Sequence, residues 1–503
     1  MTQYIMHCAA PAARRLLLAL CVGVAGGVAG CSTSGAGRPS VSFEDRTGSI
    51  QQDRPEIDKP ADLTAAGQSI DGLVQVALYQ SPAMIESAAT IREATGNIDV
   101  AKGGYLPTVS GGVTGGVGDA DDPSFVLSAN QLLFDFGRTD REVARADLSA
   151  QEAVLEFQAN ADQVLMDVLT AYAEFSRYRN NVKIDQERVK RLGELSNLIG
   201  QRASAGATTQ PDVLAAQNSL EKARHDLLEM QSERDRAANQ LREYSGPFAI
   251  DLNVDLEKVP GACTPAPTVP DTLPDVALAH LEIAQAQLEY EDAQKARLPG
   301  VSAEAYGRQP LYDEGFRVGI NFNVLPTLWQ GGAIEAARRA AEDALAAAKA
   351  RLDKVRQTAS LDALDAGTAM TNARQLIASA NTQTKLLDQT RALYRSQYFD
   401  LGTRNLNDLL DAEEDYYNAL IERSDSERDL DIALLQCHLT GGTLRSALGL
   451  SNVTLYGYPI DSFGVDVGEE EAAPSEKAEE PSQPQPLPVT NAIGSKTLFP
   501  EAG

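Results

Sequence analysis

Histidines and cysteines are the residues of this sequence that could most readily bind a metal or transfer protons. His225, His280 and His438 lie far apart, and no two have the i, i+4 spacing that places two zinc ligands on one helix face. The sequence also contains no Cys-x-x-Cys pair and no serine, histidine and aspartate spaced as in a hydrolase. We therefore predict no metal site, no cofactor and no enzymatic activity.

A fragment of a phosphate-binding loop, Gly-Ser-Lys-Thr, occurs at residues 494–497. It lacks the earlier glycine of the full motif, and it lies in a tail rich in glutamate and proline. Such a tail cannot bury enough apolar surface to order itself. We therefore assign no nucleotide site to this fragment and predict that residues 451–503 form a disordered acidic tail.

The N-terminus has the features of a lipoprotein signal. Two arginines precede an apolar run over residues 16–28, which is too short to span a membrane as a mature helix. The sequence Val-Ala-Gly-Cys then ends at Cys31 and resembles a lipobox, and the following Ser32 favours sorting to the outer membrane. We predict that residues 1–30 are removed, that Cys31 carries the lipid and that residues 31–60 form a flexible tether. The alternative is an ordinary signal peptide in which Cys31 has no role.

Two cysteines, Cys263 and Cys437, remain once those of the signal and the lipid site are set aside. A secreted chain enters an oxidising compartment, where disulfides form and persist. The two residues therefore either form a disulfide or stay as two buried thiols, and the sequence leaves both alternatives open.

The charge and hydropathy of the chain narrow its partners. The formal net charge is -27, from 71 acidic and 44 basic residues, so we expect no nucleic-acid partner. No run past residue 30 is long and apolar enough for a membrane-spanning helix. Any part of the mature chain that enters a membrane is therefore expected to do so on strands.

The predicted helices and strands of the chain are organised as two similar halves. Three pairs of segments recur at offsets of 192 to 196 residues. They are Leu106–Ser110 with Leu298–Ser302, Leu133–Gly137 with Leu328–Gly332, and Gly206–Ala216 with Gly402–Ala412. We interpret them as an internal duplication, with repeats over residues 61–245 and 273–450 and a proline-rich, non-helical linker over 246–272.

Each half has the same order of patterns: a helix, a Leu-Pro boundary, two strands, a very long helix, a short break at a glycine and another helix. The clearest strand covers residues 316–324, where apolar residues alternate strictly with polar or small ones. Such a strand has one apolar face and the length of a tilted membrane strand. The other strands are expected over 107–117, 125–136 and 300–311.

Four strands cannot close a barrel, and an open sheet edge in lipid leaves backbone groups unpaired at a cost of several kcal/mol each. Several copies of the chain are therefore expected to pool their strands, as a dimer, a trimer or a tetramer. The alternative is a soluble coiled-coil protein with two small hairpins.

The long helical patterns contain no proline from residue 124 to 210 or from 327 to 458. Between residues 334 and 377, apolar residues, mostly alanines, recur at three- and four-residue spacing, which is typical of a coiled-coil seam with closely packed helices. A helix over 333–400 would be on the order of 100 Å long. Such a rod suits a protein that spans a gap.

These patterns resemble the TolC family of outer-membrane factors over residues 64–450. The segment Tyr398–Glu413 is similar to the family's periplasmic helix-turn-helix tip, and Leu133–Arg138 is similar to its strand-to-helix return. The resemblance implies a mixed α/β membrane protein of the cell outer membrane: a homotrimer with a twelve-strand β-barrel in lipid and a coiled-coil helical tunnel in the periplasm. It further implies a passive conduit whose partners are a periplasmic adaptor protein and an inner-membrane transporter.

The resemblance also assigns roles to charged residues near the tips. Asp408 and Asp411 match acidic rings at the closed periplasmic entrance, where three like carboxylates raise the cost of ionisation and favour cations. Their alternative role is that of a solvated helix face. Arg404 matches the family's latch arginine, and Asp212 matches the acidic partner of that arginine on the neighbouring chain.

Two glycines match the turns of the tips. Gly206 and Gly402 are expected to allow each turn and to contact the adaptor; the alternative is a plain helix end without a partner. One departure from the family is Pro211, which fits the first turn of a helix.

Three functions remain open at this point. The first is the outer component of a type I protein secretion system with an ABC exporter, because residues 398–418 are closer to that branch of the family. The second is the outer component of a proton-driven multidrug efflux pump, which the lipid site at Cys31 favours. The third is a lipid-anchored structural protein of the envelope.

Overall fold

The computed structural model describes residues 57, 69–115, 123–245, 263, 269–312, 315–326 and 329–461. All of them belong to the unit that spans residues 1–466. The predicted signal, Cys31, and most of the predicted tether, linker and tail lie outside the described residues.

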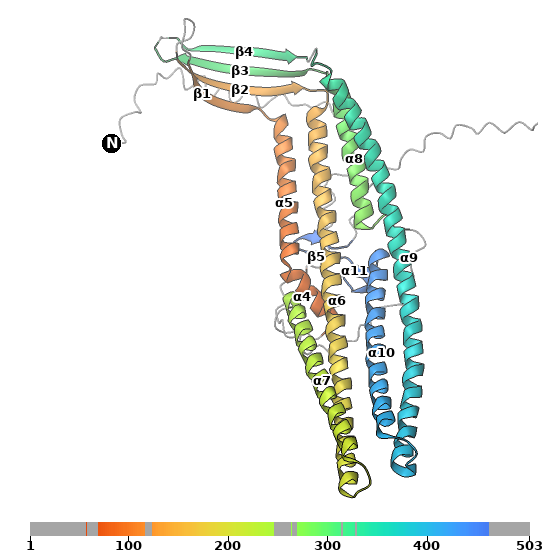
Figure 1. Cartoon of the computed structure of the whole chain (residues 1–503). Coiled ribbons are helices and arrows are strands. Elements are labelled where there is room, and N and C mark those ends of the chain that lie inside the picture. The colour runs from red at the N-terminus through yellow and green to blue at the C-terminus, as the bar shows by residue number, and fades with distance from the viewer. Residues whose placement is uncertain are drawn as a thin grey trace, which may run out of the picture. The chain divides into compact units, whose positions relative to one another are not determined.

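Two long helical hairpins dominate this unit (Figure 1). The first consists of α6, Arg138–Ser204, and α7, Gln210–Ser245. The second consists of α9, Ala333–Ser396, and α10, Leu406–Thr440, with a π-helical turn η4, Gln397–Leu401, at the end of α9. Because α6 packs on both α7 and α10, the two hairpins lie side by side in one chain.

The lengths of α6 and α9 follow from sequences free of proline. They have 67 and 64 residues, which corresponds to about 100 Å for each helix. The helix predicted over 333–400 is thus confirmed, and its end is the π-helical turn.

Three shorter helices pack on the long ones. They are α4, Ile70–Gln80; α5, Pro82–Lys102; and α8, Pro274–Lys295. α5 and α8 line the part of the bundle near the sheet, and α4 lies beside α6 and α7 at the far end of α5 from the sheet (Figure 1). The single helix predicted over 64–103 is divided at Ser81, because Pro82 lacks the N–H that would continue the ladder and starts a new helix. A 3-10 turn η1, Gly103–Tyr105, follows α5.

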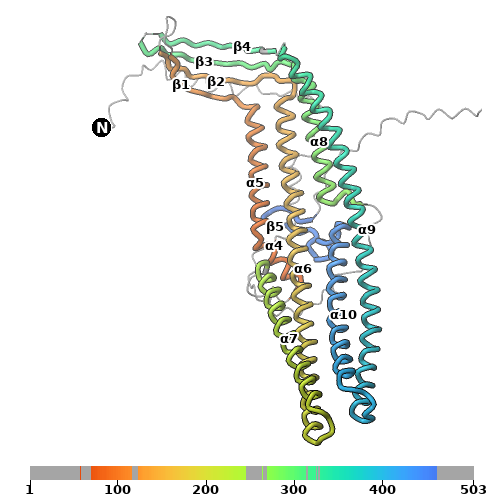
Figure 2. Tube along the Cα trace, in the orientation of Figure 1, coloured from red at the N-terminus to blue at the C-terminus, as the bar shows by residue number. Residues whose placement is uncertain are grey.

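Four strands form one antiparallel sheet in the order β1-β2-β3-β4. They are β1, Thr108–Thr114; β2, Ser124–Phe134; β3, Gly300–Pro310; and β4, Arg317–Leu325. Figure 2 shows the sheet at one end of the helices and the tips of both hairpins at the other. The order α5, β1, β2, α6, α7 is followed by α8, β3, β4, α9, α10, so each half supplies one β-hairpin and one helical hairpin.

The largest core lies where α4, α5, α6 and α8 meet the segment after α10. Phe157 and Tyr172 of α6 are fully buried there. The ring of Phe157 contacts that of Tyr458 edge to face, with 6.1 Å between the ring centres.

The disorder predicted from residue 451 is wrong up to residue 461. A short helix, α11, Leu444–Ala447, leads into β5, Thr454–Leu455, which pairs with β6, Tyr458–Pro459. Leu455 and Ile460 are fully buried, because this apolar stretch precedes the glutamate- and proline-rich part of the tail.

The predicted tether contains one residue that is packed rather than flexible. The side chain of Ile57 is buried, and its backbone N–H donates to the carbonyl of Thr454 at 2.8 Å. The prediction of a flexible tether is therefore wrong at this position.

α9 has two opposite faces of different character. Its buried residues are mostly small and lie on the face toward α8 and α10: Ala348, Leu352, Ala363, Ala366, Met370, Ala373, Ala380 and Thr384. Its exposed large apolar side chains are leucines 361, 364, 376, 386 and 393. At about 100° per residue, these leucines fall within one arc of roughly 120° on the other side of the helix. Leu376, at one edge of this arc, lines a groove between α9 and α10. The other four leucines, called the leucine face, are each more than half exposed.

A disulfide connects the inter-repeat linker to α10. The Sγ atoms of Cys263 and Cys437 are 2.02 Å apart, and the two Cα atoms are 6.1 Å apart. The bond packs against Ala366 and Met370 of α9. It therefore closes a covalent loop of 174 residues that contains β3, β4 and α9.

Removal of this disulfide is expected to destabilise the helical part. In the chain-entropy model a loop of this length contributes up to about 5 kcal/mol, because the cross-link limits the unfolded chain. We expect Cys263→Ser with Cys437→Ser to lower the urea midpoint of the far-ultraviolet circular dichroism. Addition of a reductant to the wild type should have the same effect. An unchanged midpoint in both experiments would contradict a stabilising disulfide.

Candidate functional site

The sheet has one mostly apolar face. The register aligns the apolar or small residues of all four strands on this side. They are Val109, Gly111 and Val113; Phe125, Leu127 and Ala129; Val301, Ala303, Ala305 and Gly307; and Val318, Ile320, Phe322 and Val324. Two glutamines, Gln131 and Gln309, lie on the same side. Ile320 is 67% exposed and Phe322 is 71% exposed. A patch of this extent indicates contact with an apolar phase.

The opposite face of the sheet is polar. Glu304 lies between Asn130 and Asn321 in the register, and Ser110 hydrogen-bonds Ser128 at 2.9 Å between the Oγ atoms. The ring of Tyr306 covers Gly319, where a Cβ atom would lie 2.6 Å from the ring. A sheet with one apolar and one polar face separates lipid from water.

Asp135 fixes the transition from β2 to α6. Its carboxylate accepts hydrogen bonds from the backbone N–H groups of Gly137, Arg138 and Thr139 and from the hydroxyl of Thr139. Burial raises the pKa of this carboxyl, but the hydrogen bonds from Thr139, Gly137 and Arg138 outweigh it and lower the pKa. A negative charge is thereby held at the positive end of the α6 dipole.

At the tip between α6 and α7, Asp212 forms hydrogen bonds within its own turn. Gly206 has φ +71°, which only glycine adopts without strain, so it allows the chain to leave α6. Asp212 accepts hydrogen bonds from the hydroxyls of Thr208 at 2.6 Å and Thr209 at 2.8 Å. These side-chain bonds, with that from the backbone of Thr209, lower the pKa of Asp212.

The second tip brings Arg404 and Asp408 together. Gly402 has φ +65°, and the side chain of Asn405 accepts from the N–H of Asp408 at 2.8 Å to cap α10. Nη1 of Arg404 lies 3.2 Å from Oδ2 of Asp408, and Nε donates to Gln397 at 3.0 Å.

The two predicted latch residues do not pair within one chain. Among the described residues, Arg404 pairs with Asp408 while Asp212 is bound by its own turn. The predicted contact lies between neighbouring chains, so it stays a prediction.

The predicted acidic residues share one face of α10. Asp408 is half-buried and Asp411 is exposed, three residues further along. Asp415, which the sequence patterns do not single out, is also exposed and extends the same i, i+3, i+7 row. The face therefore carries three carboxylates within about two helical turns.

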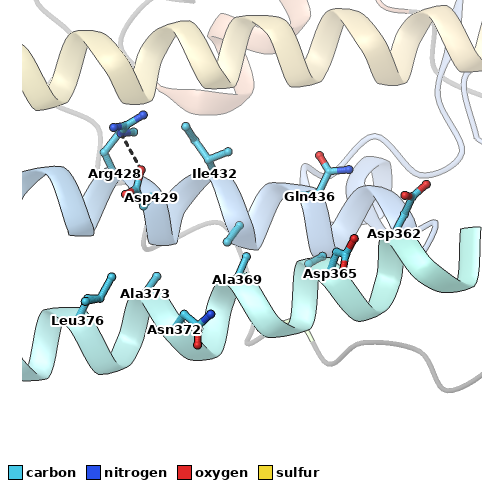
Figure 3. A pocket seen from close by; sticks show the side chains of 12 residues that line it. Asp362, Asp365, Ala369, Asn372, Ala373, Leu376, Arg428, Asp429, Ile432 and Gln436 are labelled. Carbon is cyan, nitrogen blue, oxygen red and sulfur yellow. Dashed lines mark ion pairs between the residues drawn. The ribbon is translucent and has the colours of Figure 1, made fainter.

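A surface groove of about 600 Å³ lies between α9 and α10 (Figure 3). Asp362 and Asp365 reach it from α9, and Asp429 from α10, where Asp429 pairs with Arg428 at 3.2 Å. In the part of the chain that the structure describes, no three His, Cys, Asp or Glu side chains are placed to hold a metal ion.

Within the same described residues, no helix is sufficiently long and apolar to cross a membrane.

The comparison with known families is decisive. The family described as outer membrane efflux protein matches residues 73–247 and 272–442. The chain belongs to this family. Its members are outer-membrane channels, so the protein is a TolC-like channel of the outer membrane with a tunnel in the periplasm, and it is not an enzyme.

Individual relatives agree with this assignment. The chain is 29% identical to protein CyaE of Bordetella pertussis over 234 residues, 45% of this chain and about half of CyaE, at 47%. It is 23% identical to outer membrane protein TolC of Escherichia coli over 470 residues, 84% of this chain and 92% of TolC. It is 25% identical to the alkaline protease secretion protein AprF of Pseudomonas aeruginosa over 358 residues, 65% and 72% of the two chains.

Solved structures share the fold at lower identity. The outer membrane channel CmeC of Campylobacter jejuni has a TM-score of 0.63 and 14% identity, over 75% of this chain and 86% of CmeC. The MtrE outer membrane channel of Neisseria gonorrhoeae, in an open state, has a TM-score of 0.63 and 18% identity, over 78% and 98%. The TolC-like fold is therefore confirmed.

Asp185 of α6 is a buried carboxylate that no sequence motif points to. Only 1% of the residue is exposed, and neither carboxylate oxygen has a hydrogen-bond partner among the described residues. Burial raises the pKa of Asp185, Arg188 lowers it in part and Asp226 of α7 raises it further, so that the pKa is about 6. The contact between α6 and α7 therefore contains a carboxyl group whose pKa is raised to about 6.

The pKa of Asp185 predicts a local dependence of stability on pH. The folded-state pKa lies above the ordinary value near 4, so protonated Asp185 favours the folded contact between α6 and α7. This stabilisation of the contact is complete below pH 4 and is lost as the pH rises through 6. Asp185→Asn, which stays neutral, should remove this dependence and stabilise the contact by up to about 3 kcal/mol at pH 7.5.

Hydrogen exchange of residues 181–189 between pH 5 and 8, corrected for intrinsic rates, measures this effect. Glu187→Gln, at an exposed neighbouring position, is the control. Weaker protection in Asp185→Asn than in the wild type at pH 7.5 would disprove the prediction.

Proposed function

We propose that this protein is the outer-membrane duct of a type I protein secretion system. Cargo would reach it through a periplasmic adaptor protein and an inner-membrane ABC exporter, which supplies the energy. The observation that carries the conduit is a four-stranded sheet with one apolar and one polar face, joined directly to helices about 100 Å long. Protein cargo is supported by the similarity to AprF, an alkaline protease secretion protein.

We infer that three copies form a twelve-strand barrel. Two features of the single chain support an oligomer. β1 and β4 each have one edge without a partner strand among the described residues, and unpaired backbone groups in hydrocarbon cost several kcal/mol each. The leucine face of α9 supplies an apolar surface that a neighbouring copy would cover. The number three comes from the family resemblance.

A multidrug efflux pump is the second candidate. The name of the family refers to efflux, and the lipobox-like sequence at Cys31 favours this branch. A lipid-anchored structural protein loses support, because the members of the family are channels.

Deletion of the gene separates the two candidates. Loss of a specific protein from the culture medium, with unchanged drug susceptibility, is expected for secretion. An unchanged set of secreted proteins with raised drug susceptibility would overturn the secretion proposal in favour of the pump.

The acidic face of α10 predicts the ion selectivity of the assembled duct. Purified particles should have the mass of a trimer and conduct cations in preference to anions in planar bilayers, because rings of carboxylates attract cations. Asp408→Asn with Asp411→Asn should shift the reversal potential in a salt gradient toward zero. Glu221→Gln, whose partner Arg224 lies on the same helix, is the control. The proposed rings are refuted by an unchanged reversal potential.

The latch predicts a change in conductance. One exposed pair is worth about 0–1 kcal/mol, so Arg404→Ser is expected to raise the conductance of the closed trimer by roughly fivefold. Bilayer recordings at equal trimer density measure this rise, with Glu221→Gln again as the control. Equal conductance in Arg404→Ser and the wild type would rule out the latch.

A further inference from the structure

Ion pairs connect α10 to α6 at intervals between the core and the tips. Arg428 of α10 pairs with Glu174 of α6 at 2.8 Å, and Arg177 of α6 pairs with Asp425 of α10 at 3.0 Å. Closer to the tips, Nε of Arg191 on α6 lies 3.7 Å from Oε1 of Glu413 on α10. The two helical hairpins are thus joined by charged groups along much of α10.

Glu413 differs from the other carboxylates of this interface because it is buried. Its side chain is 2% exposed, compared with 27% for Glu174 and 37% for Asp425. A buried carboxylate is stable only where cations replace the lost water. Arg391 of α9 supplies the nearer cation, with Nη1 at 3.2 Å, and Arg191 supplies the second. Glu413 therefore connects three helices.

Neighbouring side chains hold Arg391 in place for this contact. Its guanidinium lies 3.7 Å from the centre of the Tyr416 ring, and it hydrogen-bonds the hydroxyl of Tyr417. Asp388, one turn earlier on α9, accepts from Nε at 2.8 Å. Because these groups lie on α9 and α10, Arg391 and Glu413 form one unit within the second hairpin, and Arg191 belongs to the first.

The position of Glu413 relates it to the channel entrance. It lies two residues after Asp411 and five after Asp408 on the same helix. The first turns of α10 cannot leave α6 unless Glu413 separates from Arg191. We propose that Glu413 is a positioning residue of the entrance: its pairing with Arg391 and Arg191 holds the start of α10 against α6 and so keeps Asp408 and Asp411 in the constriction. This inference rests on the proposed conduit function.

Neutralisation of Glu413 is expected to remove the attraction between the two helical hairpins at this position. Arg391 would keep Asp388 and Arg191 would keep Glu194, but the two guanidinium groups would lose the carboxylate that they share across the hairpins. Removal of one partner from the buried pair of Glu413 and Arg391 is strongly unfavourable. The start of α10 should therefore separate from α6, which widens the entrance.

Bilayer recordings of the purified trimer test this inference. Glu413→Gln should raise the conductance of the closed state on the order of tenfold, which corresponds to about 1.4 kcal/mol. Glu413→Asp, which keeps the charge, should restore most of the closure. The matched control is Glu427→Gln, which removes a charge of α10 whose partner Arg423 lies on the same helix. This control should conduct like the wild type.

Hydrogen exchange of residues 406–412 gives a readout that does not depend on conduction. Faster exchange in Glu413→Gln, restored in Glu413→Asp, is expected. If Glu413→Gln does not assemble, Arg391→Gln tests the same contact and should give a smaller change in the same direction.

The outcomes separate the two proposals. A wild type that does not conduct would refute the conduit, and the exchange experiment would still test Glu413. If the wild type conducts, and both Glu413→Gln and Arg391→Gln equal it in conductance and in exchange, the role of Glu413 is overturned.

Discussion

The pairing of backbone hydrogen bonds is the constraint on which this structure depends. Where water is absent, each N–H and C=O needs a partner within the protein. β2 and β3 have partner strands on both edges, whereas β1 and β4 have one each among the described residues. A sheet of this kind in hydrocarbon requires further strands, and additional copies of the same chain are the simplest source. The direct connection of the strands to α5, α6, α8 and α9 then places the helices beneath the membrane.

The long helices lead to the same conclusion through a different interaction. The buried face of α9 consists mainly of small residues, which let α8 and α10 approach closely, whereas the four residues of the leucine face are exposed. Leucines exposed over so many turns lose the free energy that their burial would provide. The sheet edges need hydrogen bonds and the leucine face needs apolar cover, and the proposed trimer would supply both.

The sequence predicts what is local and misses what depends on distant partners. The strand expected over 316–324 is β4, Arg317–Leu325, because alternation along one strand suffices to reveal it. The sequence does not decide whether Cys263 and Cys437 form a disulfide, because the distance between them depends on the path of the chain that connects the two repeats. Glu413 is one acidic residue among many on a helix with periodic charges. Its burial is decided by the rotation of α10 against α6 and α9, which no local pattern encodes.

The tips combine contacts that can change partners with one that cannot. Asp212 is bound by the threonines of its own turn, and Arg404 by Gln397 and Asp408, all at or near the surface. Such contacts are worth about 0–1 kcal/mol, so both residues can exchange them for partners on a neighbouring chain at little cost. The side chain of Glu413 is 2% exposed, so loss of Arg391 or Arg191 would leave its charge without hydration. Under the proposed role of Glu413, changes of partner at the exposed tips proceed only as far as the buried contact allows, and that contact limits the movement at the entrance.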